Sequence, residues 1–404
     1  MESLLQNTSS RWNPAEKFLL RFFGLFVVLF ISTFSFPHSI LPDPGKYLSP
    51  WFEKLAAWTG RHVFGLERAF EPRLISDSTG FYLHAFNAMI LSLLLAAVWT
   101  RLDRKSRNDN LLRYGFIVIA RYYLALQLLI YGLSKVFKWQ FYLPEPNTLF
   151  TPLGYLHRDI LFWSAMGVSR SYTVFSGLVE VLPALLLLFR PTRLAGALIA
   201  AGVMTHVLAL NLSFDISVKL YSAFLLLLCL FILAPDAPRL WAFFFRQYAP
   251  PAPFRSPAFR RKNLYLLAKT IAICLILTDA LYPYLSSGNF NDDRAPRPPL
   301  HGAYEVMSGN SWQRVFVHRK GYFVIQSAEG LMQDYGLITD TLRRKLILEQ
   351  WEPAAITEIS YWEDSAGFLL LEGDFFGDSL RLGLRKLPLD ELPLLKQEFN
   401  WTID

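Results

Sequence analysis

Apolar residues along this chain gather in long uninterrupted runs. A helix that crosses ~30 Å of hydrocarbon needs about 20 mostly apolar residues, and seven runs meet that length. They lie at roughly 18–36, 81–99, 114–137, 172–189, 194–212, 217–234 and 264–283. No small-residue cleavage site follows the first run before Pro37, so we expect it to remain as an anchor. The pattern predicts a polytopic α-helical membrane protein of about seven transmembrane helices.

After Pro283 the pattern changes to short segments in which apolar and polar residues alternate. Seven of these segments predict strands. They lie at 302–307, 312–318, 321–327, 345–349, 356–362, 367–373 and 379–386. A hairpin connection at 372–378 joins the last two. We expect a small all-β domain, either a sandwich or a partly closed barrel. A barrel could hold a small ligand, but no cluster of polar residues marks a pocket, which favours an interior that packs side chains alone.

Two further segments divide the membrane part. Residues 47–64 have apolar positions at helical spacing, which predicts an amphipathic helix at the outer interface, with Trp51 and Trp58 at headgroup level, or a buried helix of a packed cap. Prolines at 249–253 exclude regular helix. The predicted organisation is two N-terminal helices with an outer loop at 1–113, a four-helix core at 114–235, a basic Pro-rich loop at 236–263, a seventh helix at 264–283 and the β-domain at 284–404.

The distribution of Lys and Arg predicts the orientation. One alternating set of connections holds 16 of them: the N-terminus, 100–113, 190–193 and 235–263. The opposite set holds 9: 37–80, 138–171 and 213–219. Because cytoplasmic loops retain positive charge, we expect a cytoplasmic N-terminus and, with seven spans, an extracytoplasmic C-terminus.

Composition excludes several classes of protein. With 53% hydrophobic and 18% charged residues, the chain is neither disordered nor fibrous. The net charge of +7 hides an acidic tail, because 284–404 contains 12 Lys and Arg against 18 Asp and Glu. The basic excess therefore faces anionic lipid and does not imply nucleic acid. Cys229 and Cys274 lie in apolar runs, so neither a disulfide framework nor a paired-thiol motif is present.

Ionisable side chains within the spans are the candidates for chemistry, because each costs roughly 2.5–3.5 kcal/mol to insert. They are His84, Arg121, Lys135, Glu180, His206, Lys269 and Asp279. Glu180 lies in mid-span, too deep for its short side chain to reach headgroups, so it needs a partner or a proton. Positions along the helices predict an intramembrane polar cluster in the outer half of the bundle, made of Glu180, His206, Tyr131, Gln127 and Lys135.

Simpler interpretations compete with this cluster. Arg121 lies early in its span and can extend to cytoplasmic headgroups, which we favour over a pairing with Glu180. Lys135 can equally reach the outer interface. A neutral, hydrogen-bonded His206 is favoured over a metal or haem ligand, because His84 and His206 form no i, i+4 pair. No metal site and no nucleotide-binding or hydrolase motif is predicted.

Four features of the core at 114–235 carry a family resemblance. They are Arg121 early in the first span, Gly132-Leu-Ser-Lys135 at its outer end, Ser176-Gly-Leu-Val-Glu180 opening the second, and the basic turn Arg190-Pro-Thr-Arg193. With these features the core resembles the DoxX-like family of four-span bacterial membrane proteins. In the tail, Gly302-Ala-Tyr-Glu-Val and the closing Phe399-Asn-Trp look like longer members. The resemblance implies a four-helix bundle in the bacterial inner membrane, and such proteins have been linked to quinol oxidase and thiosulfate–quinone systems.

Two hypotheses about function follow, with a weaker third. The favoured one is a non-enzymatic scaffold or accessory subunit of the cell envelope, which sits in the lipid bilayer, needs no cofactor and presents the outer β-domain to a protein partner. The alternative is a redox-linked subunit in which Glu180, with Tyr131 and His206, contacts a quinone or relays a proton. The third, by distant similarity to the membrane domains of vitamin K-dependent carboxylases, makes Lys135 a base.

Overall fold

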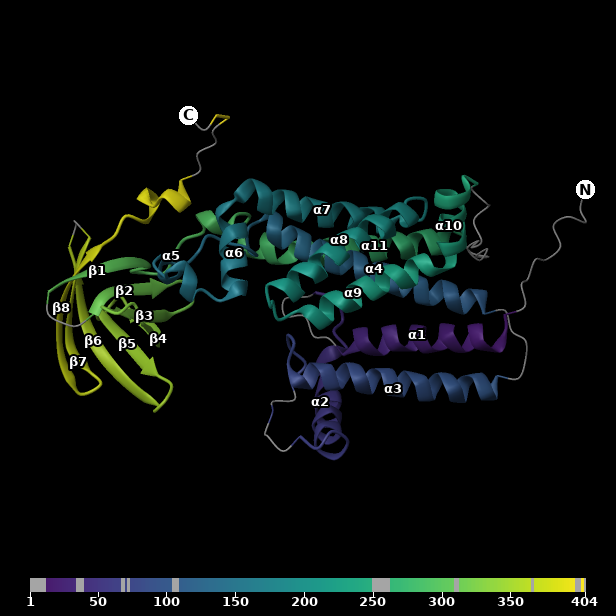
Figure 1. The fold of residues 1–404 in the computed structure, drawn as a ribbon, viewed down its shortest axis with the longest axis horizontal. Coiled ribbons are helices and arrows are strands. Elements are labelled where there is room, and N and C mark those ends of the chain that lie inside the picture. Colours follow the sequence, from purple (N-terminus) through teal and green to yellow (C-terminus); the bar gives the residue numbers. More distant parts are fainter. Residues whose placement is uncertain are drawn as a thin grey trace, which may run out of the picture. The chain divides into compact units, whose positions relative to one another are not determined.

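The computed structural model describes residues 12–33, 40–66, 70, 73–103, 109–248, 262–308, 312–364, 367–396 and 401–402. The chain forms two compact units, Met1–Phe137 with Val174–Phe290 and Lys138–Thr173 with Asn291–Asp404. The first unit is helical, and the second contains the strands (Figure 1). Sequence reasoning treated 138–171 only as an outer connection, whereas the structure groups it with the β-domain. The Pro-rich stretch at 249–253 lies outside the described residues.

The long helices establish a multi-pass membrane protein. Their bounds are α1 Pro14–Ser32, α2 Gly45–His62, α3 Thr79–Leu102, α4 Asn110–Val136, α7 Arg170–Leu188, α8 Arg193–Ser213, α9 Lys219–Leu233, α10 Ala237–Arg246 and α11 Lys262–Ser287. Six helical stretches in the described part of the chain are long and apolar enough to cross a membrane: α3, α4, α7, α8, Lys219–Arg246 and Asn263–Arg294. The predicted total of about seven is not confirmed, because α1, with 19 residues, carries Glu16, Lys17 and Arg21.

The helix α1 packs along α3 and runs in the opposite direction. Arg21, near the start of α1, donates a hydrogen bond to Asp103 Oδ2 at 2.6 Å, just beyond the end of α3. After the other end of α1, the Thr33 hydroxyl lies 2.8 Å from Nε2 of His84, in the first turns of α3. The two helices therefore lie side by side over most of their length (Figure 1).

The helices α4 and α7 touch through two glycines. A Cβ added at Gly132 would lie 2.8 Å from the carbonyl oxygen of Gly177, and one added at Gly177 would lie 2.5 Å from the carbonyl oxygen of Gly132. The two backbones can approach this closely only because both positions lack a side chain. Each glycine precedes a charged residue by three positions, Lys135 on α4 and Glu180 on α7. The same helix contact therefore brings these two charges together.

The predicted amphipathic helix is present as α2, which lies across α3 (Figure 1). Its inner face packs through Phe52, whose ring centroid is 5.0 Å from that of His84, and through Thr59, which donates to Asn87 Oδ1 at 2.9 Å. Trp51 and Trp58 are exposed. Exposed indoles favour a helix at the membrane interface over a buried helix of a packed cap.

The strands form one closed antiparallel barrel in sequence order. They are β1 Gly302–Ser308, β2 Trp312–His318, β3 Tyr322–Ser327, β4 Met332–Asp340, β5 Lys345–Gln350, β6 Ala355–Glu363, β7 Phe368–Phe375 and β8 Asp378–Lys386. The strand β4 is absent from the seven predicted strands. Gln333 and Asp334 at its start are exposed, Gly336 interrupts it, and Ile338 points outward, so its sequence lacks the alternation of a half-buried strand.

Alternating residues of all eight strands fill the inside of the barrel. The buried set comprises Tyr304, Val315, Val317, Phe323, Ile325, Tyr335, Leu346, Leu348, Ile359, Tyr361, Leu369, Leu371, Leu380, Leu382 and Leu384. In a barrel of eight strands the interior is just wide enough for side chains to occupy it. The packed interior favoured by the sequence is therefore the arrangement observed.

The connection between α4 and α7 covers part of the outer face of this barrel. It contains the short helices α5 Pro146–Leu149 and α6 Arg158–Val168. After α5, the Phe150 ring stacks 5.8 Å from Phe316 of β2, and Arg314 lies 5.0 Å above Phe150. Gln326 of β3 donates to the Phe150 carbonyl oxygen at 3.3 Å. These contacts explain why the structure groups the connection with the strands.

Candidate functional site

Lys135 and Glu180 form a buried ion pair inside the helical unit. Lys135 Nζ lies 2.7 Å from Glu180 Oε2 and also donates to the Tyr131 carbonyl oxygen at 3.4 Å. The two residues are only 6% and 4% exposed. Their positions follow from the Gly132–Gly177 contact, because one helical turn separates each glycine from its charged residue. Glu180 thus has the partner that a carboxylate in the middle of a membrane span requires.

The structure brings together some of the other predicted cluster members and not all. Lys135 Nζ lies 5.8 Å from the centroid of the Tyr131 ring. Gln127 lies one turn before Tyr131 on α4 and is fully buried. Among the described residues its amide nitrogen and oxygen have no hydrogen-bond partner. His206 is exposed on α8, so its side chain does not belong with these buried groups.

The remaining intramembrane candidates lie elsewhere. His84 is enclosed by aromatic rings, with Phe30 at 5.3 Å, and bonds to Thr33, as expected of a structural histidine. Asp279 accepts a hydrogen bond from the backbone nitrogen of Ile40 at 2.7 Å. Lys269 lies 5.9 Å from the ring of Phe189. Arg121 is buried at the end where α4 begins and, among the described residues, is not paired with Glu180.

Removing one member of the buried pair should destabilise the helical unit. Glu180→Ala leaves the Lys135 charge buried without its carboxylate, which costs about 3–5 kcal/mol. We expect a lower thermal midpoint in detergent, measured by scanning fluorimetry. The double variant Lys135→Met with Glu180→Leu should regain most of this loss. Asp215→Ala, which removes an exposed partner of Lys219, is the control and should change little. A double variant as unstable as Glu180→Ala would show that the pair is not the cause.

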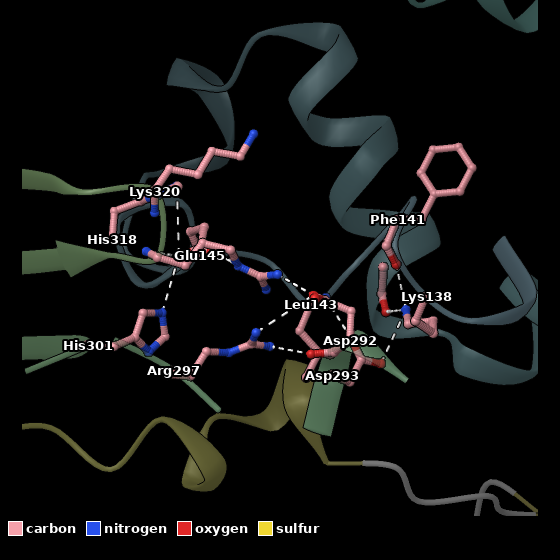
Figure 2. A network of polar contacts seen from close by, with 12 residues as sticks. Lys138, Phe141, Leu143, Glu145, Asp292, Asp293, Arg297, His301, His318 and Lys320 are labelled. Carbon is pink, nitrogen blue, oxygen red and sulfur yellow. Dashed lines mark hydrogen bonds and ion pairs between the residues drawn. The ribbon is translucent and has the colours of Figure 1, made fainter. Parts of the chain in front are cut away.

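A second polar network lies within the β-domain unit and is centred on Glu145 (Figure 2). The Glu145 carboxylate accepts hydrogen bonds from Nε2 of His301 at 3.2 Å and from the backbone nitrogen and Nε of Arg319, the former at 3.2 Å. Nε2 of His318 lies 3.7 Å away. Glu145 precedes α5 and His301 precedes β1, whereas His318 ends β2 and Arg319 follows it. One carboxylate thus joins three separate segments.

The network continues through two aspartates. Arg319 also bonds to Asp292, and Arg297 donates to the carbonyl oxygen of Asp292 at 2.9 Å. Asp293 accepts from the backbone nitrogen of Leu143 at 3.1 Å and pairs with Lys138 Nζ at 3.5 Å. Lys138 itself donates to the carbonyl oxygens of Phe141 and Gly167. Together these contacts hold the 138–173 connection against the segment that leads into the barrel.

The surroundings of Glu145 keep it ionised. Burial alone would raise its pKa, but the hydrogen bond from His301 and the charges of His318 and Arg319 outweigh burial and lower the pKa to about 2. Burial lowers the pKa of His318 despite the nearby carboxylate. No group of three or more His, Cys, Asp and Glu side chains that could hold a metal occurs in the part of the chain that the structure describes. The Glu145 carboxylate is held by hydrogen bonds from His301 and Arg319.

Sequence reasoning did not identify this network. Glu145 lies between two prolines, and its partners come from positions more than 140 residues further along the chain. The available signal was the placement of His301, His318 and Arg319 at the edges of predicted strands, where polar side chains gather at one end of a barrel. Pairing them with Glu145 required knowing that the connection folds onto the strands.

Acidification should weaken the β-domain unit in two steps. Unfolded, Glu145 titrates near its ordinary pKa of 4.5, so the stability that its folded pKa of about 2 provides is complete above pH 4.5 and is lost as the pH falls towards 2. The lowered pKa of His318 acts in the same direction, because below pH 6.5 the unfolded chain takes up a proton more readily than the folded unit. Denaturant unfolding of the full-length protein at stepped pH measures both.

The variant Glu145→Gln should remove the lower of these two steps. It should also reduce the free energy of unfolding at pH 7 by about 1.5–3 kcal/mol, because the charge-assisted hydrogen bonds to the carboxylate are lost while Asp292 still pairs with Arg319. Hydrogen exchange of the β1 to β3 amides in the full-length protein reports this loss. Glu305→Gln, which removes an exposed partner of Arg385, is the matched control and should cost less than about 1 kcal/mol. Equal losses in both variants would contradict a special role for Glu145.

Comparison with known proteins identifies a relative. A stretch of 145 residues, 35% of the chain, is 32% identical to "Uncharacterized protein YwoB" of Bacillus subtilis (strain 168) and covers 91% of that protein. The chain therefore belongs to the same family as YwoB. No family model matches the chain. No solved structure matches it either.

Proposed function

We propose that this protein is a scaffold or accessory subunit of the cell envelope, whose membrane helices present the β-barrel to a protein partner on the extracytoplasmic side. The observation that carries the proposal is the packed barrel interior. Because fifteen buried side chains occupy it, recognition falls to the outer surface of the barrel. A scaffold role needs such a surface, a fixed attachment and a defined side of the membrane.

The outer surface offers an apolar patch on β4, β5 and β6. Ile338 lies opposite Ile347 in the strand register, and Ile356 lies opposite Glu349, two residues along from Ile347. Ile338 and Ile356 are 65% and 70% exposed. Single exposed apolar residues are common, but neighbours on one sheet face are typical of a protein contact. We call Ile338, Ile347 and Ile356 the isoleucine patch.

The β-domain unit is connected to the membrane helices at more than one point of the chain. The chain passes between the two compact units three times, at 137–138, 173–174 and 290–291. Within the β-domain unit, the Glu145 network binds the 138–173 connection to the barrel.

The grouping of residues 138–173 with the barrel supports the proposed orientation. Residues 138–173 and the barrel form one compact unit. Its described residues contain no complete candidate span, so we place the whole unit on one side of the membrane. The chain between them, 174–290, must then cross an even number of times, which agrees with α7, α8, α9 and α11 as four spans. The basic connections at 100–113 and 235–263 fall on the opposite side, where positive charge indicates the cytoplasm.

We count α1 as the seventh span and the core at 114–235 as DoxX-like. The antiparallel packing of α1 on α3 supports the first assignment, because its start then lies at the same end as the basic connections. The resemblance of the core rests on Gly132-Leu-Ser-Lys135 and Ser176-Gly-Leu-Val-Glu180. The glycine contact and the ion pair give these two motifs one joint structural role, which supports their use as a family signature.

Crosslinking from outside the membrane tests the scaffold proposal. With Ile356→Cys, a membrane-impermeant maleimide crosslinker added to spheroplasts should give one discrete adduct, because the isoleucine patch faces the partner. Native Cys229 and Cys274 lie in α9 and α11, out of reach of the reagent. Arg381→Cys, on the exposed outer face of β8, should be labelled without an adduct.

Two results would count against the proposal. If neither cysteine variant is labelled from outside, the barrel does not lie on the extracytoplasmic side. If both are labelled and no adduct forms, the isoleucine patch is not a partner surface. Adding Ile338→Asp to the Ile356→Cys variant should abolish an authentic adduct, because a charge in the patch opposes burial against a partner.

A quinone-linked or proton-linked subunit is the second candidate, and Gln127 is the observation that favours it. Its buried amide, for which the described residues provide no partner, could donate to a quinone carbonyl oxygen, and Tyr131 follows one turn later on α4. His206, exposed on α8, drops out of this candidate. The carboxylase-like alternative gains no support, since Lys135 is engaged by Glu180.

The quinone content of the purified protein tests the second candidate function. Purified protein should then carry a lipid-soluble quinone, and Gln127→Leu should weaken its retention by about threefold to tenfold through loss of one hydrogen bond. Asn211→Leu, which removes another buried amide on α8, is the matched control and should leave retention unchanged. Extracts repeatedly free of quinone would eliminate this candidate without affecting the scaffold proposal.

A further inference from the structure

Arg121 is a buried cation that no carboxylate of the described residues pairs. It is 6% exposed, and its guanidinium lies 4.8 Å from the ring of Tyr122. Among the residues that the structure describes, Arg121 makes no hydrogen bond and no ion pair, and its Nε is enclosed without a partner. A buried charge is costly unless it is paired. The position therefore calls for an anion that is not part of the protein.

Arg121 lies within electrostatic range of Arg193, the first residue of α8, and Arg193 connects it to further arginines. Arg193 interacts electrostatically with four others: Arg113 and Arg121 of α4, Arg190 of the turn before α8, and Arg239 of α10. We call these five residues the arginine cluster. Their guanidinium groups come from three separate stretches of the chain, so the concentration of positive charge is a product of the fold rather than of one basic segment.

Among the described residues, the carboxylates at this end are Glu16, Asp103, Asp109 and Asp236, four against the five arginines of the cluster together with Lys17 and Arg21. Asp236 is bonded to Arg193. Asp103 and Asp109 are both engaged by Arg21. The adjoining connections at 104–108 and 249–261 contain no Asp or Glu. The cluster therefore keeps an excess of positive charge around the buried guanidinium of Arg121.

The residues of α10 indicate that this end of the unit lies near the membrane interface. The helix α10 buries no residue and exposes Trp241, Phe244 and Phe245. A short helix with exposed aromatic residues and basic residues is typical of one that lies in the membrane interface. The phosphates of lipids occupy the same depth, and a guanidinium binds a phosphate through two parallel hydrogen bonds.

We propose that the arginine cluster is a binding site for the phosphate of an anionic phospholipid headgroup, with Arg121 as its central ligand. Basic pockets between helices on the positively charged side of a membrane protein suit such headgroups. A soluble phosphate compound shares the same chemistry, so the experiment has to separate the two sources. The proposal does not depend on the role of the β-barrel.

Native mass spectrometry of the full-length protein tests the site. After incubation with phosphatidylglycerol, wild-type protein should retain the lipid, with no comparable retention of phosphatidylcholine. Arg121→Gln should weaken phosphatidylglycerol binding by about tenfold to hundredfold, because charge-assisted hydrogen bonds are lost. Arg121→Lys keeps the charge but not the planar fork, and should weaken it less. Arg101→Gln, an exposed arginine at the same end, is the matched control and should bind as wild type does.

A stability measurement keeps the test decisive if binding is hard to quantify. In detergent without anionic lipid, Arg121→Gln should be at least as stable as wild type, because it removes an unpaired buried charge. Phosphatidylglycerol should raise the thermal midpoint of wild-type protein and not that of the variant. Equal responses of the two proteins would overturn the site. A response to inorganic phosphate or glycerol 3-phosphate, without one to phosphatidylglycerol, would overturn the lipid as its source.

Discussion

The contact between Gly132 and Gly177 sets the distance between α4 and α7, and the polar interior of the bundle depends on that distance. With any side chain at either position the backbones would separate, and Lys135 and Glu180, one turn away, would no longer meet at 2.7 Å. Each charge would then be buried alone, at a cost of several kcal/mol. In this membrane core the ion pair therefore depends on the close packing of the two helices.

The β-domain unit solves a comparable problem by a different route. Glu145 brings a charge into contact with His301, His318 and Arg319, all of which belong to the ends of strands. Because these partners are polar groups at the edge of a barrel, the carboxylate is stabilised without any close approach of backbones. The connection that carries Glu145 can then cover the apolar outer face around Phe316, which would otherwise be exposed.

How far the sequence predicts this molecule depends on whether a feature is local. Runs of apolar residues locate the six helical stretches that are long and apolar enough to cross a membrane. Alternation locates seven of the eight strands, because both periodicities depend on neighbouring residues. The strand β4 escapes because Ile338 faces outward. Glu180 could be recognised as needing a partner, but the choice of Lys135 over His206 depends on helix rotation and on the glycine contact. The Glu145 network depends on tertiary contacts across more than 140 residues.

Three buried charges in this chain differ in how they are neutralised. Glu180 is matched by Lys135 within the bundle, and Glu145 by a cluster of cations, so both can be explained by stability alone. Arg121 is matched by neither, although it is as deeply buried as Lys135. The fold supplies partners for two of these buried charges. It places the third near further arginines, which leaves a site for an anion from outside the protein. Near the membrane interface we propose that this anion is lipid phosphate.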